Sequence, residues 1–151
     1  SIDSKNKKEN YSSTYGILGE TEDGVQSEYI LLKPENIYPK PAHLSFEEAA
    51  SMPLVFMTSY QMLVERAKIK KDDIVLIYGG TSGIGMAAIQ IAKLFNCYVF
   101  ATAGTEDKLN KMKNLGADFV SKHTSDDFGE IIRENTGRNG VNVVFRIHLQ
   151  V

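Results

Sequence analysis

A glycine-rich turn at residues 79–85 is the part of this sequence whose residue types and spacing are best suited to chemistry. It reads Gly-Gly-Thr-Ser-Gly-Ile-Gly and follows a run of apolar and aromatic residues at 75–78. Such a turn brings the backbone close to a phosphate, and a side chain at Gly83 or Gly85 would block that approach. A helix after the turn would aim free N–H groups at the anion. The pattern predicts a binding site for the diphosphate of a dinucleotide.

The segments on both sides of the turn have the periodicity needed to position it. A second β-like run at residues 97–102 closes a βαβ unit of the expected length. Between the turn and that run, apolar residues recur at helical spacing: Ile84, Ala87, Ala88, Ile91, Ala92 and Phe95.

Strands and helices alternate through the rest of the chain from residue 70. Strands are expected at 74–78, 97–102, 119–121 and 141–145, and helices at 83–96, from Thr105 to about Leu115, and from Ser125 to about Asn135. Gly116 and Gly137 follow the last two helices as C-terminal caps. This alternation predicts an α/β fold with a parallel sheet, here the first half of a doubly wound sheet.

The first seventy residues have a weaker pattern. Residues 1–15 are polar, and residues 29–32 predict a strand. Ser45 and Glu48 have the spacing of a capping box, which predicts a helix start. Residues 51–67 are expected to be helical, with a break or a new first turn at Pro53. Five apolar side chains of this region are interpreted as core: Met57, Tyr60, Met62, Leu63 and Val64.

Composition and charge narrow the class of protein. The chain has 151 residues, of which 42% are hydrophobic, and a net charge of −2, so neither a nucleic-acid nor a membrane partner is implied. Its single cysteine, Cys97, begins a buried strand and is interpreted as a small core residue. The lack of a possible internal disulfide favours the cytoplasm. Because residue 1 is Ser and not Met, a partial chain is expected.

Several motifs together resemble the medium-chain dehydrogenase/reductase superfamily, in its zinc-type alcohol dehydrogenase-like and NADPH:quinone reductase-like branch. They lie at residues 16–20, 44–50, 79–85, 88–93 and 115–118. The resemblance implies three parts. Residues 1–45 would end a GroES-like, β-rich substrate domain, residues 46–70 would be connecting helices, and residues 71–151 would form part of a Rossmann domain.

The resemblance also implies which residues bind the cofactor. In the turn they are Gly80, Thr81, Ser82, Gly83, Ile84 and Gly85. Thr58 would lie near the nicotinamide and the diphosphate, with a helix N-cap or a packed threonine as the alternative.

The tip of the second strand bears on the choice of nucleotide. NAD-selective sites usually carry an acidic residue there, whereas residues 103–105 are small and neutral. NADP(H) is therefore expected over NAD(H), with Thr105 and Lys108 as contacts to the 2′-phosphate. Glu106 and Asp107 are the evidence against this preference, because they are acidic and follow the tip directly. They are interpreted as residues of the first helical turn that point away from the nucleotide. Lys108 could instead belong to a solvated helix face.

Metal binding is not expected in this chain. Ser1, Ser4 and Ser12 stand at positions where zinc-containing members carry cysteines, and a hydroxyl is a poor zinc ligand. Chance in a Ser-rich segment is the alternative reading of the three serines. Residues 54–57, where the family has a catalytic zinc ligand, offer no ligand atom.

The tail departs from the family pattern. The family usually follows a strand like residues 143–145 with an acidic residue and then a glycine, but here Arg146 follows. A truncation or reading-frame change would produce this departure. Arg133, Arg138 and His123 are interpreted as surface residues.

The resemblance implies an oxidoreductase that moves hydride between a nicotinamide and an alcohol or carbonyl, a quinone or an enone. The chain by itself is expected to be weakly active or inactive, and its catalytic residues are not identified. The alternatives are a nucleotide-binding or interaction module on a reductase scaffold without catalysis, or an inert fragment. A short-chain dehydrogenase is disfavoured because no Tyr-x-x-x-Lys follows the turn. The expected partners are the dinucleotide and a small-molecule substrate, with a second copy of the chain as an open alternative.

Overall fold

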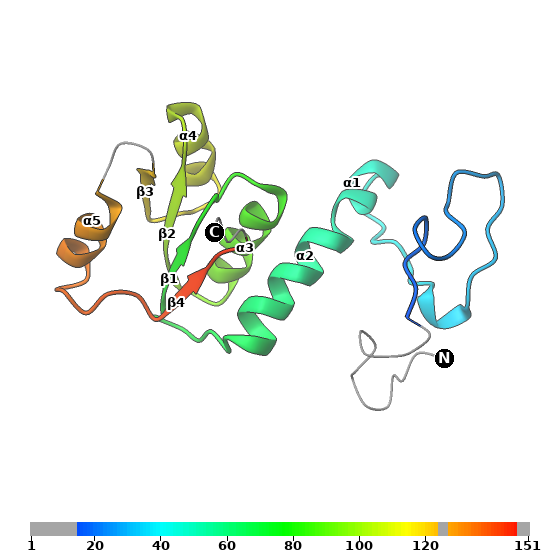
Figure 1. The fold of residues 1–151 in the computed structure, drawn as a ribbon, viewed down its shortest axis with the longest axis horizontal. Helices are drawn as coiled ribbons and strands as arrows, with labels where there is room; N and C mark the ends of the chain where they lie inside the picture. The colour runs from blue at the N-terminus through cyan, green and yellow to red at the C-terminus, as the bar shows by residue number, and fades with distance from the viewer. Residues whose placement is uncertain (1–14, 124–126, 148–151) are drawn as a thin grey trace. The chain divides into compact units, whose positions relative to one another are not determined.

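The computed structural model describes residues 15–123 and 127–147. Its internal contacts divide the chain into two units, residues 1–40 and residues 41–151. Figure 1 labels the α-helices and strands of the second unit. Each unit is described by itself.

The described part of the first unit, residues 15–40, has little regular secondary structure. It contains one short 3₁₀ helix, η2 (Pro34–Asn36), and one isolated bridge between Leu18 and Glu22. The prediction of a strand at residues 29–32 is wrong, because Tyr29 and Leu31 lie outside any strand and are 89% and 98% exposed. Apolar residues favour a strand only where a sheet can bury one of their faces.

A four-stranded parallel sheet organises the second unit. Its strands are β1 (Ile74–Ile77), β2 (Tyr98–Ala103), β3 (Phe119–Lys122) and β4 (Val143–Phe145). They lie in the order β3-β2-β1-β4, with Leu76 opposite both Phe100 and Val144. The α/β class and the four strands expected beyond residue 70 are confirmed, with ends that differ by one or two residues.

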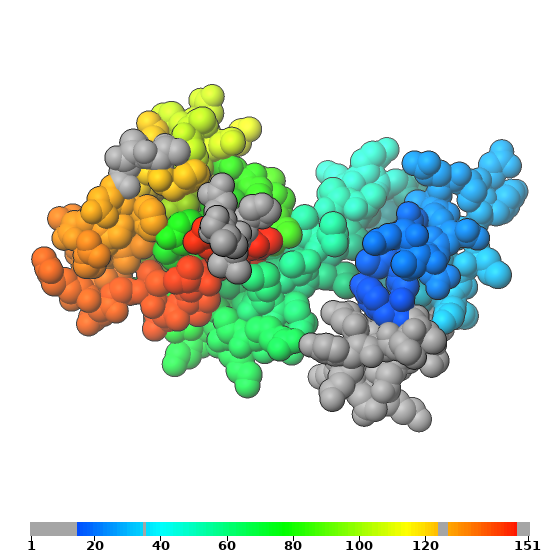
Figure 2. Space-filling view, viewed as in Figure 1, coloured from blue at the N-terminus to red at the C-terminus, as the bar shows by residue number. Residues whose placement is uncertain are grey.

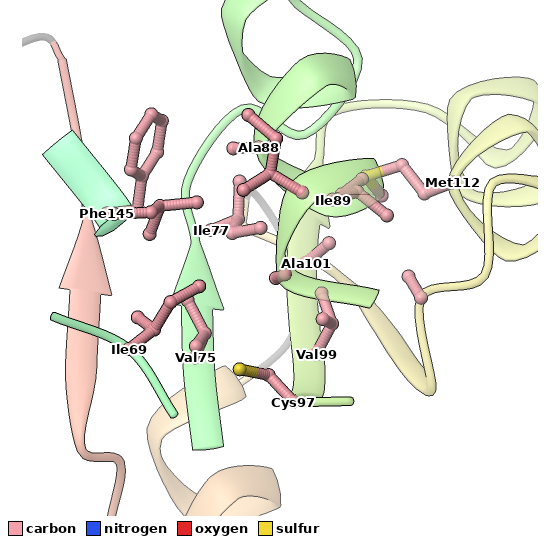
Figure 3. Packing of buried hydrophobic residues seen from close by; sticks show 14 of the residues in the cluster. Ile69, Val75, Ile77, Ala88, Ile89, Cys97, Val99, Ala101, Met112 and Phe145 are labelled. Carbon is pink, nitrogen blue, oxygen red and sulfur yellow. The ribbon is translucent and has the colours of Figure 1, made fainter. Parts of the chain in front are cut away.

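Helices pack on both faces of this sheet (Figure 1). Side chains of α3 (Gly83–Leu94) and α4 (Glu106–Asn114) pack with Val75, Ile77 and Val99 in the main core. Figure 3 shows this cluster, including Ala88, Ile89 and Met112 from the two helices. Helix α5 (Phe128–Asn135) packs on the other face against Leu76 and Phe100. Successive strand residues thus serve opposite faces, as strand pleating requires.

Three helical segments precede the sheet: α1 (Phe46–Ser51), α2 (Pro53–Tyr60) and the π-helical η3 (Gln61–Arg66). The capping box is confirmed, since the Ser45 Oγ accepts from the Glu48 N–H at 3.1 Å and the Glu48 Oε2 accepts from the Ser45 N–H at 2.8 Å. Pro53 opens a new first turn, as expected.

The core assignment in this region is only partly confirmed. Leu63 is fully buried, and Met62 and Val64 pack against the core. Met57 and Tyr60 are 69% and 47% exposed, so their assignment to the core is wrong. The fully buried residue of α2 is Ser59, and Phe56 packs against the main core, so the packed side of the helix carries these residues and not Met57 or Tyr60.

The helix ends follow the expected chemistry with two exceptions. Gly116 and Gly137 adopt left-handed φ values of +99° and +57°, as expected of C-terminal caps. Thr105 stands at the N-cap of α4 but makes no side-chain cap bond. Ser125, the expected start of the next helix, lies outside the described residues. The cap of α5 is Asp127, whose Oδ1 accepts from the Glu130 N–H at 3.0 Å. Asp127 lies directly before the first helical residue, where an acceptor reaches the N3 amide.

Among the helices in the described ranges, none has the length and apolar character needed to cross a membrane.

Candidate functional site

The glycine turn between β1 and α3 is held by the neighbouring strand. Gly79 has a φ of +64°, a conformation that glycine adopts without strain. Its N–H donates to the Thr102 Oγ1 at 3.4 Å, and the Gly80 N–H donates to the Thr102 carbonyl at 3.0 Å. Thr102 is 1% exposed. Sequence reasoning missed this residue, although a hydroxyl inside an apolar strand marks a buried polar group that needs a partner.

Helix α3 begins at the turn with a complete N-cap. The Ser82 Oγ accepts from the Gly85 N–H at 3.0 Å, and the Ser82 N–H donates to the Gly79 carbonyl at 2.9 Å. Gly83 and Ile84 carry the first two N–H groups of the helix, which have no intrahelical acceptor. These amides, together with the helix dipole, form a site suited to an anion.

The glycines at 80 and 85 are explained by packing inside the protein. A Cβ at Gly85 would meet the Gly79 carbonyl oxygen and lie 2.8 Å from the Gly80 Cα. A Cβ at Gly80 would meet the Met112 Sδ and lie 3.1 Å from the Ala101 Cβ. At Gly85 the reason for glycine is therefore the close approach of helix and turn, rather than the phosphate clearance that the sequence suggested.

An open groove of about 620 Å³ lies at this end of the sheet. The turn contributes Gly79, Ser82, Gly83 and Ile84; the other lining residues are Val55, Tyr78, His123, Phe128, Arg146 and Ile147. Ligands of open α/β sheets bind outside the carboxyl ends of the strands, where the strand order reverses. Between β1 and β4 the order reverses in this way, and the turn and Arg146 lie at those two strand ends.

The predicted site residues are distributed unevenly around the groove. Ser82, Gly83 and Ile84 line it, whereas Gly80 and Gly85 are buried beneath the turn and Thr81 is half-buried beside it. Thr105 and Lys108 are exposed and are not among the lining residues.

Thr58 lies in the middle of α2. Its Oγ1 donates to the Leu54 carbonyl at 2.7 Å, so the N-cap alternative is wrong.

Helix α2 contributes two residues that sequence reasoning missed. The Ser59 hydroxyl is fully buried and donates to the Ile84 carbonyl at 2.9 Å. Val55 lines the groove, and its Cγ1 lies 3.0 Å from the position of a Cβ on Gly83. Together they fix α2 against the first turn of α3. In the sequence Ser59 carries no signal that distinguishes it from its neighbours Thr58 and Gln61.

His123 is exposed, as predicted, but it also lines the groove. It follows β3, and its imidazole lies 3.8 Å from the position of a Cβ on Gly104. The carboxyl ends of β2 and β3 therefore bring this side chain to the groove.

Metal ligands do not gather in the part of the chain that the structure describes: no three His, Cys, Asp or Glu side chains there could hold a metal ion together. Ser1, Ser4 and Ser12 lie outside the described residues. Cys97 is 2% exposed and belongs to the main core, which confirms its assignment. Burial raises the pKa of the Cys97 thiol, with the Asp73 carboxylate as a further cause.

A parallel sheet with helices on both faces, and with a glycine turn at the point where the strand order reverses, is the mark of a Rossmann-type fold. Residues 83–148 match the family model described as zinc-binding dehydrogenase. With the relatives described next, this shows that the chain belongs to the medium-chain dehydrogenase/reductase superfamily.

The chain is 32% identical over 127 residues to a quinone oxidoreductase of Sus scrofa, covering 84% of this chain and 39% of that protein. A crystal structure of an NAD-dependent alcohol dehydrogenase has a TM-score of 0.84 and 46% identity, with coverage of 90% of this chain and 40% of the other. Mycobacterial Rv1454c in complex with NADPH has a TM-score of 0.65 and 33% identity, with coverage of 69% and 32%. The chain thus spans about two fifths or less of the length of these relatives.

Proposed function

We propose that this chain binds a nicotinamide dinucleotide in the groove and serves an NAD(P)H-dependent oxidoreductase that transfers hydride to or from an alcohol or carbonyl, a quinone or an enone. The observation that carries the proposal is the first turn of α3, where the Gly83 and Ile84 N–H groups lie at a groove that also contains Gly79. Anions bind readily to such a helix start.

The residues of the chain contribute binding and orientation. Gly83 and Ile84 receive the diphosphate, while Thr102 holds the turn in place through the Gly79 and Gly80 amides. Val55 and Phe128 provide apolar walls of the groove, against which the apolar faces of the ligand rings can pack. A bound nicotinamide supplies the hydride chemistry itself.

We infer a preference for NADP(H) over NAD(H). The tip of β2 at residues 103–105 carries no acidic side chain to repel a 2′-phosphate. Glu106 pairs with Lys122 at 2.7 Å, which supports its reading as a residue directed away from the nucleotide. The NADPH complex of a relative is consistent with this preference, whereas the relative named as NAD-dependent is not. Thr105 and Lys108 are the proposed contacts to the 2′-phosphate.

Other parts of the proposal rest on family resemblance alone. Thr58 would approach the nicotinamide end of the cofactor, with its hydroxyl still able to accept a hydrogen bond. Residues 1–45 would be the end of a GroES-like substrate domain, and the cytoplasm would be the location.

The test is a fluorescence titration of NADPH and NADH against the full chain. We expect saturable binding of both, tighter for NADPH. Lys108→Glu should weaken NADPH binding about tenfold by replacing attraction with repulsion at the 2′-phosphate, and should leave NADH nearly unchanged. Lys111→Glu is the matched control, since it reverses the same charge at an exposed position of the same helix, further from the tip of β2. Equal losses for both nucleotides in Lys108→Glu would contradict the assigned contact.

Turnover is tested separately by following NADPH absorbance with an enone, a quinone and an aldehyde. Consumption of NADPH with any of them supports the oxidoreductase. Saturable binding without turnover would favour the alternative of a nucleotide-binding module.

A further inference from the structure

Arg146 lies at the edge of the groove, directly after β4. The pairing of β1 with β4 sets Ile77 opposite Phe145, and the Tyr78 N–H donates to the Phe145 carbonyl at 3.0 Å. Arg146 therefore lies beside Tyr78, the residue that leads into the glycine turn. Figure 2 shows the end of β4, in red, at the surface of the second unit.

The guanidinium of Arg146 is placed by an aromatic pair. Its Cζ lies 5.3 Å from the centre of the Tyr78 ring, within the range of a cation–π contact. The Tyr78 ring packs edge-on against Phe128 with their centres 5.4 Å apart. Both rings line the groove together with Arg146, so the cation is held at the wall rather than on a freely moving surface chain.

The described lining of the groove carries charge of one sign. That lining includes no Asp or Glu and contains the positively charged guanidinium of Arg146. Gly79, Ser82 and Gly83 lie in the same lining. A planar guanidinium offers paired donors that match phosphate oxygens, and the start of α3 offers partial positive charge from the other side.

We propose that Arg146 is a diphosphate-binding residue of the groove and fixes the dinucleotide between β4 and the first turn of α3. This inference rests on the proposed function, because it assigns a further contact to the same ligand. The proposal predicts two results of the binding titrations. NADH and NADPH must depend equally on Arg146, since they share the diphosphate, and binding must weaken with salt.

The experiment compares Arg146→Gln and Arg146→Lys with the unsubstituted full chain in titrations of NADH and NADPH at low and high salt. Arg66→Gln is the matched control, since it removes the same charge from an exposed position on η3, outside the groove. Circular dichroism of each variant checks that the fold is retained. We expect Arg146→Gln to weaken the binding of both nucleotides about tenfold and to reduce the dependence of that binding on salt. Arg146→Lys should lose less of the binding affinity than Arg146→Gln, and Arg66→Gln should change the affinity for neither nucleotide.

The possible outcomes separate the two proposals. If the unsubstituted chain binds neither nucleotide, the proposed function and this inference both fail. If it binds and Arg146→Gln binds equally well, only this inference fails. A loss confined to NADPH would overturn it too, because Arg146 would then contact the 2′-phosphate and not the diphosphate.

Discussion

At the scale of single residues, the glycine turn is limited by contacts within the protein. Gly85→Ala would drive a Cβ into the Gly79 carbonyl and the Gly80 backbone. Overpacking of this kind costs about 1–3 kcal/mol, more than the gain of up to about 1 kcal/mol from alanine in a helix. We therefore expect a net loss in the free energy of unfolding, measured by urea titration.

Gly104→Ala provides the control for that substitution. Its Cβ would meet the His123 ring at an ordinary 3.8 Å, so we expect a change within about 0.5 kcal/mol. Equal stability of the two variants would show that the turn and α3 are not in close contact.

Cys97 supports a second prediction at this scale. Burial raises the pKa of its thiol, so less thiolate, the reactive form, is present at a given pH. Its Sγ lies 3.4 Å from the Lys70 carbonyl oxygen, and access to reagents is restricted. We expect iodoacetamide at pH 8 to modify the folded chain at least about tenfold more slowly than the chain in urea, as followed by mass spectrometry. Similar rates in both would contradict the burial of Cys97.

The same pKa shift has a consequence at high pH. The folded state keeps the Cys97 proton to a higher pH than the unfolded state does. The resulting contribution to stability is present below the unfolded pKa of the thiol and is lost as the pH rises above it.

At the scale of elements, one carboxylate joins α3, β2 and the start of β3. The Asp118 Oδ2 accepts from the Lys93 Nζ at 2.8 Å and from the Val99 N–H at 2.7 Å. Val99 is fully buried, so Asp118→Ala leaves its amide without this acceptor. We expect a loss of about 1–3 kcal/mol in the free energy of unfolding, measured by chemical denaturation.

The Glu106–Lys122 pair offers the comparison. Its N–O distance is 2.7 Å, but the Glu106 side chain is 67% exposed. Exposed pairs contribute about 0–1 kcal/mol, so Glu106→Ala should cost clearly less than Asp118→Ala. A larger cost at Glu106 would overturn this ranking.

At the scale of the whole molecule, the second unit has its own core. The described residues of the two hydrophobic clusters all lie between positions 56 and 145. We expect a variant of residues 41–151 to fold and to unfold in urea within about 0.5 kcal/mol of the full chain. Loss of cooperative unfolding in that variant would show that residues 1–40 are needed for the fold.

The fold of the second unit could be predicted to within a few residues because its signals are local. Ile84, Ala87 and Ile91 follow the helical period, and the helix they predicted is α3. The same reasoning failed at residues 29–32, where apolar residues find no sheet to pair with, and at Met57, which faces away from the core. In both cases burial depends on neighbours that are distant in the sequence.

The candidate site was predictable in its centre and not at its walls. The spacing of the turn located Ser82 and Gly83, both of which line the groove. The spacing did not identify Thr102, which accepts hydrogen bonds from the turn, or Val55, which packs next to Gly83. Neither residue carries a motif, and each matters only because a strand or helix places it against the turn.

The sequence alone therefore determined the α/β class, the glycine turn and its position at the start of α3, because periodicity and backbone freedom are properties of neighbouring residues. Only the tertiary structure decided which side chains complete the groove. The parallel order β3-β2-β1-β4 brings the carboxyl ends of separate strands to one edge. His123 and Arg146 reach the groove beside the turn through that arrangement, although they are about forty and sixty residues away from the turn along the chain.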